Sequence, residues 1–175
     1  RWNVNLPAGL QGVAPDASII AVQMFSYKPP STSWSRDAGA AVFDSDFAEA
    51  LQAVDSATLG NNKFVVNISV GDPTRQYDST SACSSQNSAG DRGLFAAAIK
   101  NLTTRGVPVV AATGNGSPAG DRNGIGWPAC VAGVIKVAAV ANDGSGTTLA
   151  EFSHIGDPAK FTGPILLAPG GSNAT

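Results

Sequence analysis

One short stretch combines a side chain that could do chemistry with neighbours that could hold it still. Gly114-Asn115-Gly116 follows the apolar run 107–113 directly. The amide of Asn115 is a neutral hydrogen-bond donor, and a donor fixed at the end of a rigid strand can stabilise an oxygen that gains negative charge during a reaction. A turn without any function is the competing interpretation, because Asn and Gly are common turn residues.

The same stretch also fits a nucleotide-binding pattern formally. Residues 114–119 satisfy G-x-G-x-x-A after a strand-like run. That pattern needs a helix that opens at the glycines and points its N-terminus at the pyrophosphate. The residues that follow, which include Pro118 and Gly120, lack helical apolar spacing, and no acidic residue is placed to hold a ribose. The sequence therefore disfavours a nucleotide-binding domain.

His154 is the single histidine, so a Ser-His-Asp triad within these residues would need it as the base. It lies in residues 151–156, which we interpret as a strand end leading to a turn, where a solvent-facing histidine is expected. No G-x-S-x-G pattern supplies a nucleophile, and no pair of carboxylates stands out. We predict that His154 is not catalytic and that the chain contains no complete triad.

Cys83 and Cys130 are the two cysteines of the chain. They are either two buried free thiols or one disulfide of a secreted protein. Neither has a C-x-x-C neighbour, and one histidine with two cysteines supplies too few ligands for a zinc-type site. No metal ligands are predicted from these residues.

Composition and charge narrow the possible partners. The 175 residues are 43% hydrophobic and 14% charged, with a net charge of -2. Lys and Arg are scattered rather than gathered in the basic stripe that phosphate backbones require, so we expect no nucleic-acid partner. No apolar run approaches the length of a membrane span, which takes about 18 residues. Because the chain opens with Arg1 and stops in the loop-like residues 169–175, we expect a piece of a longer protein, truncated at both ends.

Strand-like runs alternate with helical patterns along the chain. This alternation is typical of a parallel sheet with right-handed crossovers, and it predicts an α/β fold. Ligands of such sheets bind where the strands end, which makes the residues after 64–70 and 107–113 candidates. The polar stretch 74–90 is predicted as a surface loop, with Asp91 as the cap of the helix that follows. Strands are expected at 18–25, 64–70, 107–113, 134–140 and 165–168, and helices around the apolar sets Phe47, Leu51, Val54 and Leu94, Phe95, Ala98, Ile99, Leu102.

Six segments, in order and spacing, resemble the subtilisin-like (subtilase) family of serine proteases between its histidine motif and its serine motif. The resemblance covers nearly the whole chain, and residues 152–156 are similar to the family's F-S-S-x-G, with His154 at the second serine. It implies a three-layer fold with a mostly parallel sheet flanked by helices, of which residues 1–175 are the central part. The segments are 12–17 (GVAPDA), 65–71 (VVNISVG), 106–115 (GVPVVAATGN), 127–140 (WPAC to VIKVAAV), 152–156 (FSHIG) and 167–170 (LAPG).

The resemblance implies a secreted or cell-surface endopeptidase that hydrolyses peptide bonds through an acyl-enzyme. Asn115 would be the side-chain donor of the oxyanion hole. Two strand ends would form the backbone walls of the S1 pocket and pair with an extended peptide or protein substrate: Ser69, Val70, Gly71 and Ala112, Thr113, Gly114.

Other parts of the family pattern are missing. The catalytic Asp and the H-G-T-H motif would precede residue 1, and the G-T-S-M-A motif would follow residue 175. We therefore expect the chain alone to be inactive and the remainder of the peptidase domain to be its partner. A non-catalytic subtilisin-like scaffold or interaction domain is the alternative.

The resemblance also bears on the cysteines and on metal. Some secreted members carry cysteines at places like Cys83 and Cys130, which favours the disulfide. A family calcium loop falls near residues 3–10, where this sequence departs from the pattern. No cofactor is predicted, and structural calcium stays open for the longer protein.

Overall fold

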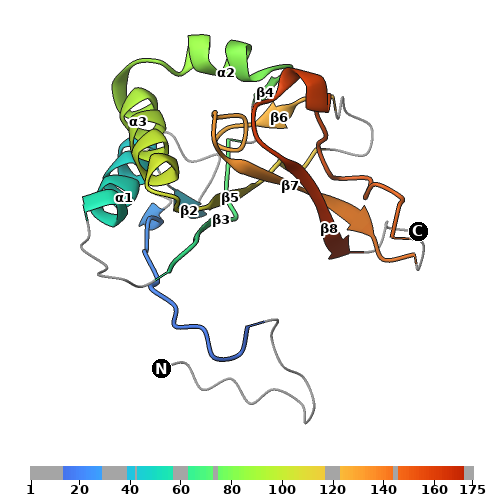
Figure 1. Ribbon diagram of the computed structural model, residues 1–175, viewed down its shortest axis with the longest axis horizontal. Coiled ribbons are helices and arrows are strands. Elements are labelled where there is room, and N and C mark those ends of the chain that lie inside the picture. Colours follow the sequence, from blue (N-terminus) through green and yellow to red (C-terminus); the bar gives the residue numbers. More distant parts are fainter. Residues whose placement is uncertain are drawn as a thin grey trace.

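A central sheet of four parallel strands organises the computed structural model, which describes residues 14–28, 39–41, 43–56, 63–72, 75–116, 123–143 and 146–171. The strands lie in the order β3-β5-β7-β8 (Figure 1). The predicted α/β class with a mostly parallel sheet flanked by helices is confirmed. The described elements are β1 (Ser26–Lys28), β2 (Gly39–Ala41), α1 (Asp44–Ser56), β3 (Val66–Ile68), β4 (Gln76–Tyr77), α2 (Thr80–Gln86), α3 (Gly90–Thr104), β5 (Val109–Ala112), β6 (Ile125–Gly126), β7 (Ile135–Ala141), the 3-10 turn Pro158–Lys160 and β8 (Ile165–Gly171).

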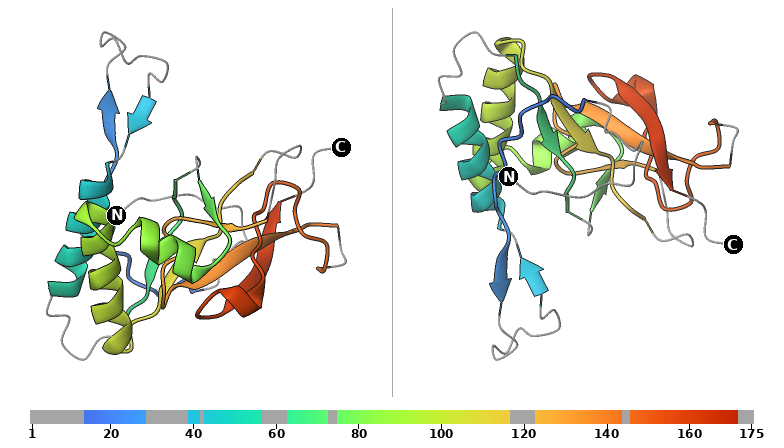
Figure 2. Two further views of the ribbon diagram at one scale, coloured as in Figure 1. Left: turned by 90° about the horizontal axis from the view of Figure 1, so that it is seen from above. Right: turned by 90° about the horizontal axis from the view of Figure 1, so that it is seen from below.

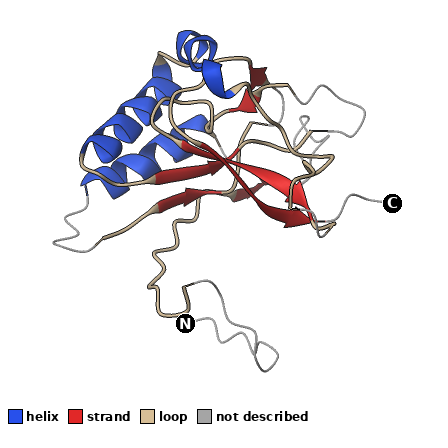
Figure 3. Ribbon diagram, turned by 45° about the vertical axis from the view of Figure 1, so that its right-hand side comes forward, coloured by secondary structure: helices blue, strands red, loops and turns tan. Residues whose placement is uncertain are grey.

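One face of the sheet packs against α1 and α3, which lie side by side over it (Figure 3). Alternate residues of β3 and β5 point to this face, as the two-residue period of a strand requires. Each large apolar side chain buried there stabilises the fold by about 1.5–3 kcal/mol. The core includes Phe47, Leu51, Ile68, Phe95, Ile99, Leu102, Val109 and Ala111.

The other face of the sheet stays accessible among the described residues. Asn67 and Ala112 are exposed there and Val110 is half-buried. The apolar run 107–113 is typical of a strand covered on both faces. In this structure α1 and α3 both cover the same face, the one that carries Val109 and Ala111. The described residues therefore leave apolar sheet surface open.

The strand predicted at 18–25 is wrong. These residues form no strand, and their apolar side chains are largely exposed. The first strand, β1, begins only at Ser26 and pairs antiparallel with β2 in a hairpin that projects from the helices (Figure 2). An apolar run becomes a strand only where a neighbour can pair its backbone N–H and C=O groups.

The surface loop predicted at 74–90 contains two ordered elements. β4 pairs antiparallel with β6, and α2 begins after Ser79, whose Oγ accepts a hydrogen bond of 3.1 Å from the backbone N–H of Ala82. The prediction that Asp91 caps α3 is also wrong. Ala89 is the N-cap, and Asp91 lies in the first turn, where a carboxylate interacts favourably with the positive end of the helix dipole.

Cys83 and Cys130 form a disulfide with an S–S distance of 2.03 Å, and both residues are fully buried. Of the two alternatives for the cysteines, the structure contains the bridge. It joins α2 to the turn that precedes β7, so it ties the segment between β4 and α3 to the segment between β6 and β7.

Candidate active site at the strand ends

The two predicted walls lie at the same edge of the sheet. β3 and β5 are parallel with Ile68 opposite Ala111, so Ser69 follows on one strand where Ala112 ends the other. Ser69, Gly71 and Ala112 are exposed, whereas Thr113 is buried. The register thus brings both wall segments, 69–71 and 112–114, to one accessible edge.

A third segment, Gly126-Trp127, lies between the two walls. The N–H of Gly126 donates to the carbonyl of Thr113 at 2.9 Å, and the N–H of Asp72 donates to the carbonyl of Trp127 at 2.9 Å. A Cβ on Gly71 would lie 2.6 Å from the Trp127 oxygen, so only glycine fits there. Our sequence reasoning did not include Gly126 among the site residues, although it precedes the Trp127-Pro128 pair of the WPAC segment.

The turn that carries Asn115 is held by main-chain bonds to the segment that ends in His154. The N–H of Gly116 donates to the carbonyl of Phe152 at 2.6 Å, and Asn115 forms an isolated antiparallel bridge with Ser153. Gly114 has a φ of 116°, in the region that favours glycine. Asn115 itself is exposed. An accessible amide therefore stands on a backbone that is fixed on both sides.

His154 does not face the solvent, so that part of its prediction is wrong. It is 3% exposed, and its Nε2 lies 2.9 Å from the side-chain nitrogen of Gln76. Ser153 and Ile155 form bridges with Asn115 and Asn123, so the segment after Glu151 lies against other main chain instead of at the surface. The expected non-catalytic role of His154 stays a prediction.

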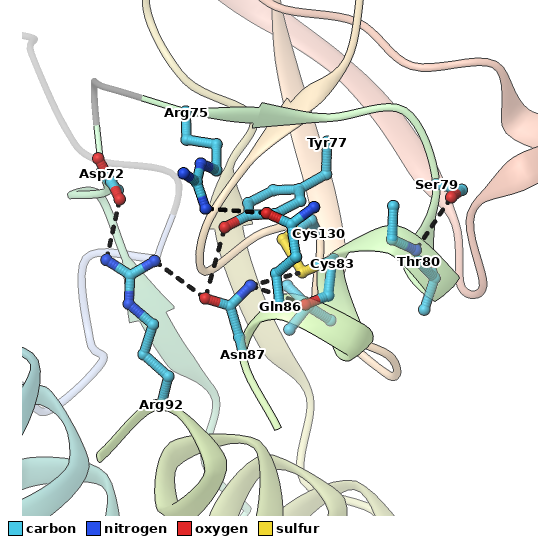
Figure 4. The surroundings of a disulfide bond; sticks show 12 residues. Asp72, Arg75, Tyr77, Ser79, Thr80, Cys83, Gln86, Asn87, Arg92 and Cys130 are labelled. Carbon is cyan, nitrogen blue, oxygen red and sulfur yellow. Dashed lines mark hydrogen bonds and ion pairs between the residues drawn. A yellow bond between two sulfur atoms is a disulfide. The ribbon is translucent and has the colours of Figure 1, made fainter. Parts of the chain in front are cut away.

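Arg92, from the first turn of α3, ties one wall to the helices (Figure 4). It forms ion pairs of 2.9 Å with Asp72 and 2.7 Å with Asp44, and its Nη1 donates to the Oδ1 of Asn87 at 2.9 Å. Its guanidinium also lies 4.8 Å from the ring centre of Trp127. Burial alone would lower the pKa of Arg92, but the hydrogen bonds and charges of the two carboxylates outweigh it and raise the pKa, so this anchor stays charged.

No group of three or more His, Cys, Asp or Glu side chains that could hold a metal ion occurs in the described part of the chain. Residues 3–10, near which the family calcium loop is expected, lie outside the described residues. Among the helices that the structure describes, none is long and apolar enough to cross a membrane.

The sequence is similar to a known protein family over nearly its whole length. A model described as "Subtilase family" matches residues 3–175. Subtilisin from Bacillus sp. (strain TA39) is 30% identical over 150 residues, which cover 85% of this chain and 29% of that protein. Subtilisin DY from Bacillus licheniformis is 28% identical over 156 residues, which cover 89% of this chain and 44% of that protein. The chain thus spans less than half the length of either relative.

Solved structures of proteases are similar to this fold. The structure titled "S41 Psychrophilic Protease" superposes with a TM-score of 0.53 and 29% identity, over 77% of this chain and 40% of the other. The one titled "Sphericase" has a TM-score of 0.52 and 28% identity, over 75% of this chain and 40% of the other.

Proposed function

Because the chain belongs to the subtilase family, we propose that it is the central part of a secreted subtilisin-like serine endopeptidase, whose complete domain hydrolyses peptide bonds through an acyl-enzyme. One observation carries the proposal. The accessible Asn115, on a fixed glycine-flanked turn, lies at the same sheet edge as the wall segments 69–71 and 112–114. The buried Cys83–Cys130 disulfide supports secretion, because such bridges persist in oxidising compartments.

Asn115 would act as an oxyanion-hole donor. Acyl transfer places negative charge on the carbonyl oxygen of the scissile peptide as the tetrahedral intermediate forms. An amide that is already oriented stabilises this charge without any reorganisation at the moment of reaction. The hydrogen bond from Gly116 to Phe152 and the bridge at Ser153 provide that orientation for the backbone of the turn.

The wall segments would bind the substrate. An extended peptide can add to the main chain of exposed strand ends, which provides affinity without sequence specificity. The exposed wall residues include the small residues Gly71 and Ala112, and a pocket walled by small residues would suit a sizeable apolar side chain of the substrate.

The nucleophile and the base would come from the remainder of the peptidase domain. H-G-T-H and G-T-S-M-A do not occur in the 175 residues, and the chain covers only 29% and 44% of the two subtilisins. The open sheet face around Val110 and Ala112 is a surface that further chain could cover. Without those segments there is no oxyanion to stabilise, so the isolated chain would be inactive.

Substitution of Asn115 in the intact protein tests the proposal. Asn115→Ala should lower kcat for a chromogenic peptide anilide by about 10²–10³-fold with little change in KM, a magnitude known from a subtilisin itself. Asn101→Ala, which removes an exposed asparagine of α3, is the matched control and should leave kcat unchanged. A loss below about tenfold for Asn115→Ala contradicts the oxyanion role, because one such donor is worth more than that.

A fluorophosphonate probe separates the enzyme from the scaffold alternative. The intact protein should be labelled at one serine, whereas the 175-residue chain should not react. Stoichiometric labelling of the chain alone would locate the whole triad within it. An intact protein that is folded but unlabelled would favour the non-catalytic subtilisin-like scaffold.

A further inference from the structure

We propose that His154 is a positioning residue for the oxyanion turn, with its buried imidazole supporting the backbone at Gly114. The proposal rests on the proposed function of Asn115. It assigns a role to a residue that our sequence reasoning treated as a surface histidine, at a place where the resembled F-S-S-x-G pattern has serine.

The imidazole fills the space beside the turn. A Cβ built on Gly114 would lie 2.6 Å from Nδ1 of His154 and 3.3 Å from its Cε1. The ring therefore lies against the α-carbon of the residue that immediately precedes Asn115. Because Gly114 also has a φ of 116°, the turn depends on its surroundings to stay in one conformation.

The main chain of His154 contacts the same strand end. Its N–H donates to the carbonyl of Gly114 at 3.2 Å, and its carbonyl accepts a hydrogen bond of 2.8 Å from Oγ1 of Thr113. Ring and backbone thus hold the two residues before Asn115 together. A change at position 154 is transmitted to Asn115 through a chain of direct contacts.

The far side of the ring is anchored on another element. Nε2 of His154 lies 2.9 Å from the side-chain nitrogen of Gln76 in β4. β4 pairs with β6, and Gly126 of β6 donates to the carbonyl of Thr113. The imidazole therefore connects the Asn115 turn to the segment that lies between the two walls, and both sides of the site share one support.

Removal of the His154 imidazole should lower the rate of the reaction rather than weaken substrate binding. Removal of the ring leaves a void beside Gly114, and the turn can then move. A displacement of about 1 Å at a reacting centre can cost about 10²-fold in rate. His154→Ala should therefore lower kcat by about ten- to hundredfold while KM changes less than about threefold.

A double-mutant cycle in the intact protein distinguishes positioning from general support of the fold. His154→Ala, Asn115→Ala and the double variant are compared on the same peptide anilide. If His154 acts through Asn115, its loss in kcat falls below about twofold once Asn115 is absent. An equal loss in both backgrounds overturns the proposal. His154→Asn, whose side chain fills part of the space beside Gly114, should lose less of kcat than His154→Ala.

A second readout does not depend on activity. Hydrogen exchange of the Gly116 amide, which bonds to Phe152, should become at least about tenfold faster in His154→Asn and faster still in His154→Ala. The Gly93 amide of α3, which bonds to Ala89, is the internal control and should not change. If His154→Ala does not fold, His154→Asn and Gln76→Ala carry the same measurement. Unchanged exchange at Gly116 overturns the positioning role, whereas normal kcat in Asn115→Ala overturns the proposed function instead.

Discussion

Residues 18–25 and strand β7 are apolar runs of similar length and composition with opposite environments. Ile19 and Ile20 are 88% and 74% exposed, whereas Ala138 and Val140 of β7 are 0% and 4% exposed. β7 lies between β5 and β8, so both of its edges are paired. Residues 18–25 pair with no strand in the described part of the chain.

The difference shows that composition sets the tendency to form a strand and that neighbours decide the outcome. Full burial of a side chain such as isoleucine is worth about 1.5–3 kcal/mol, and an exposed one contributes almost nothing. β7 therefore stabilises this chain, whereas within residues 18–25 Met24 alone is partly buried against the core. In the complete domain that we propose, 18–25 would gain a partner and the contrast would shrink.

The largest expected effect is a difference in the free energy of unfolding between two valine variants, one in β7 and one in residues 18–25. Val140→Asp places a charge at a buried position of β7. It should lower the free energy of unfolding by more than about 4 kcal/mol, enough to unfold the chain. Val22→Asp, at a residue that is half exposed, should change the free energy of unfolding by less than about 0.5 kcal/mol. Urea unfolding followed by circular dichroism measures both.

The same two variants, made in the intact protein, test whether residues 18–25 gain a partner there. If residues 18–25 pair with the remainder of the domain, Val22→Asp becomes destabilising there by about 2 kcal/mol or more. Similar losses for the two variants in the 175-residue chain would contradict the contrast, because they would show that Val22 is buried in that chain.

Lys136 of β7 should give a smaller effect that depends on pH. Its side chain is fully buried, and burial lowers its pKa from 10.5 to about 8. Between about pH 8 and 10.5 the unfolded chain binds more protons than the folded one, so the free energy of unfolding should rise with pH, by about 3 kcal/mol at most. Urea unfolding at several pH values in this window measures the rise.

Two variants isolate the contribution of Lys136. Lys136→Met should abolish most of the rise, because the titrating group is gone. Lys100→Met, at an exposed lysine of α3, should retain it. An equal pH dependence in both variants would mean that the ammonium of Lys136, which donates to the carbonyls of Val134 and Thr162, is not destabilised by burial.

Much of the fold follows from local patterns. β3, β5 and β7 fall on the apolar runs that predict them, and α1 and α3 on the two sets of residues with helical spacing. α2 could not be predicted in this way, because its sequence TSACSSQ has no apolar stripe. Its position depends on the cap at Ser79 and on the disulfide at Cys83, and the second of these is a contact distant in sequence.

The candidate site, too, could be predicted only where local sequence determines it. The turn at Asn115 is predictable, because Gly-Asn-Gly directly follows a strand-like run. The places of Gly126 and His154 are not, because each is set by contacts with residues 113 and 114, which are distant in sequence. Local sequence identifies the residue that would meet the substrate but not the residues that hold it there.

The Cys83–Cys130 bridge encloses the Asn115 turn and one of the two walls in a covalent ring. A single proteolytic nick anywhere between the two cysteines would leave both fragments attached to each other. The nicked protein would migrate as one band in a gel without reductant and separate into two after reduction. For a chain proposed to be part of a secreted protease, which can cut its own copies, a first cut in this region would not by itself release the pieces.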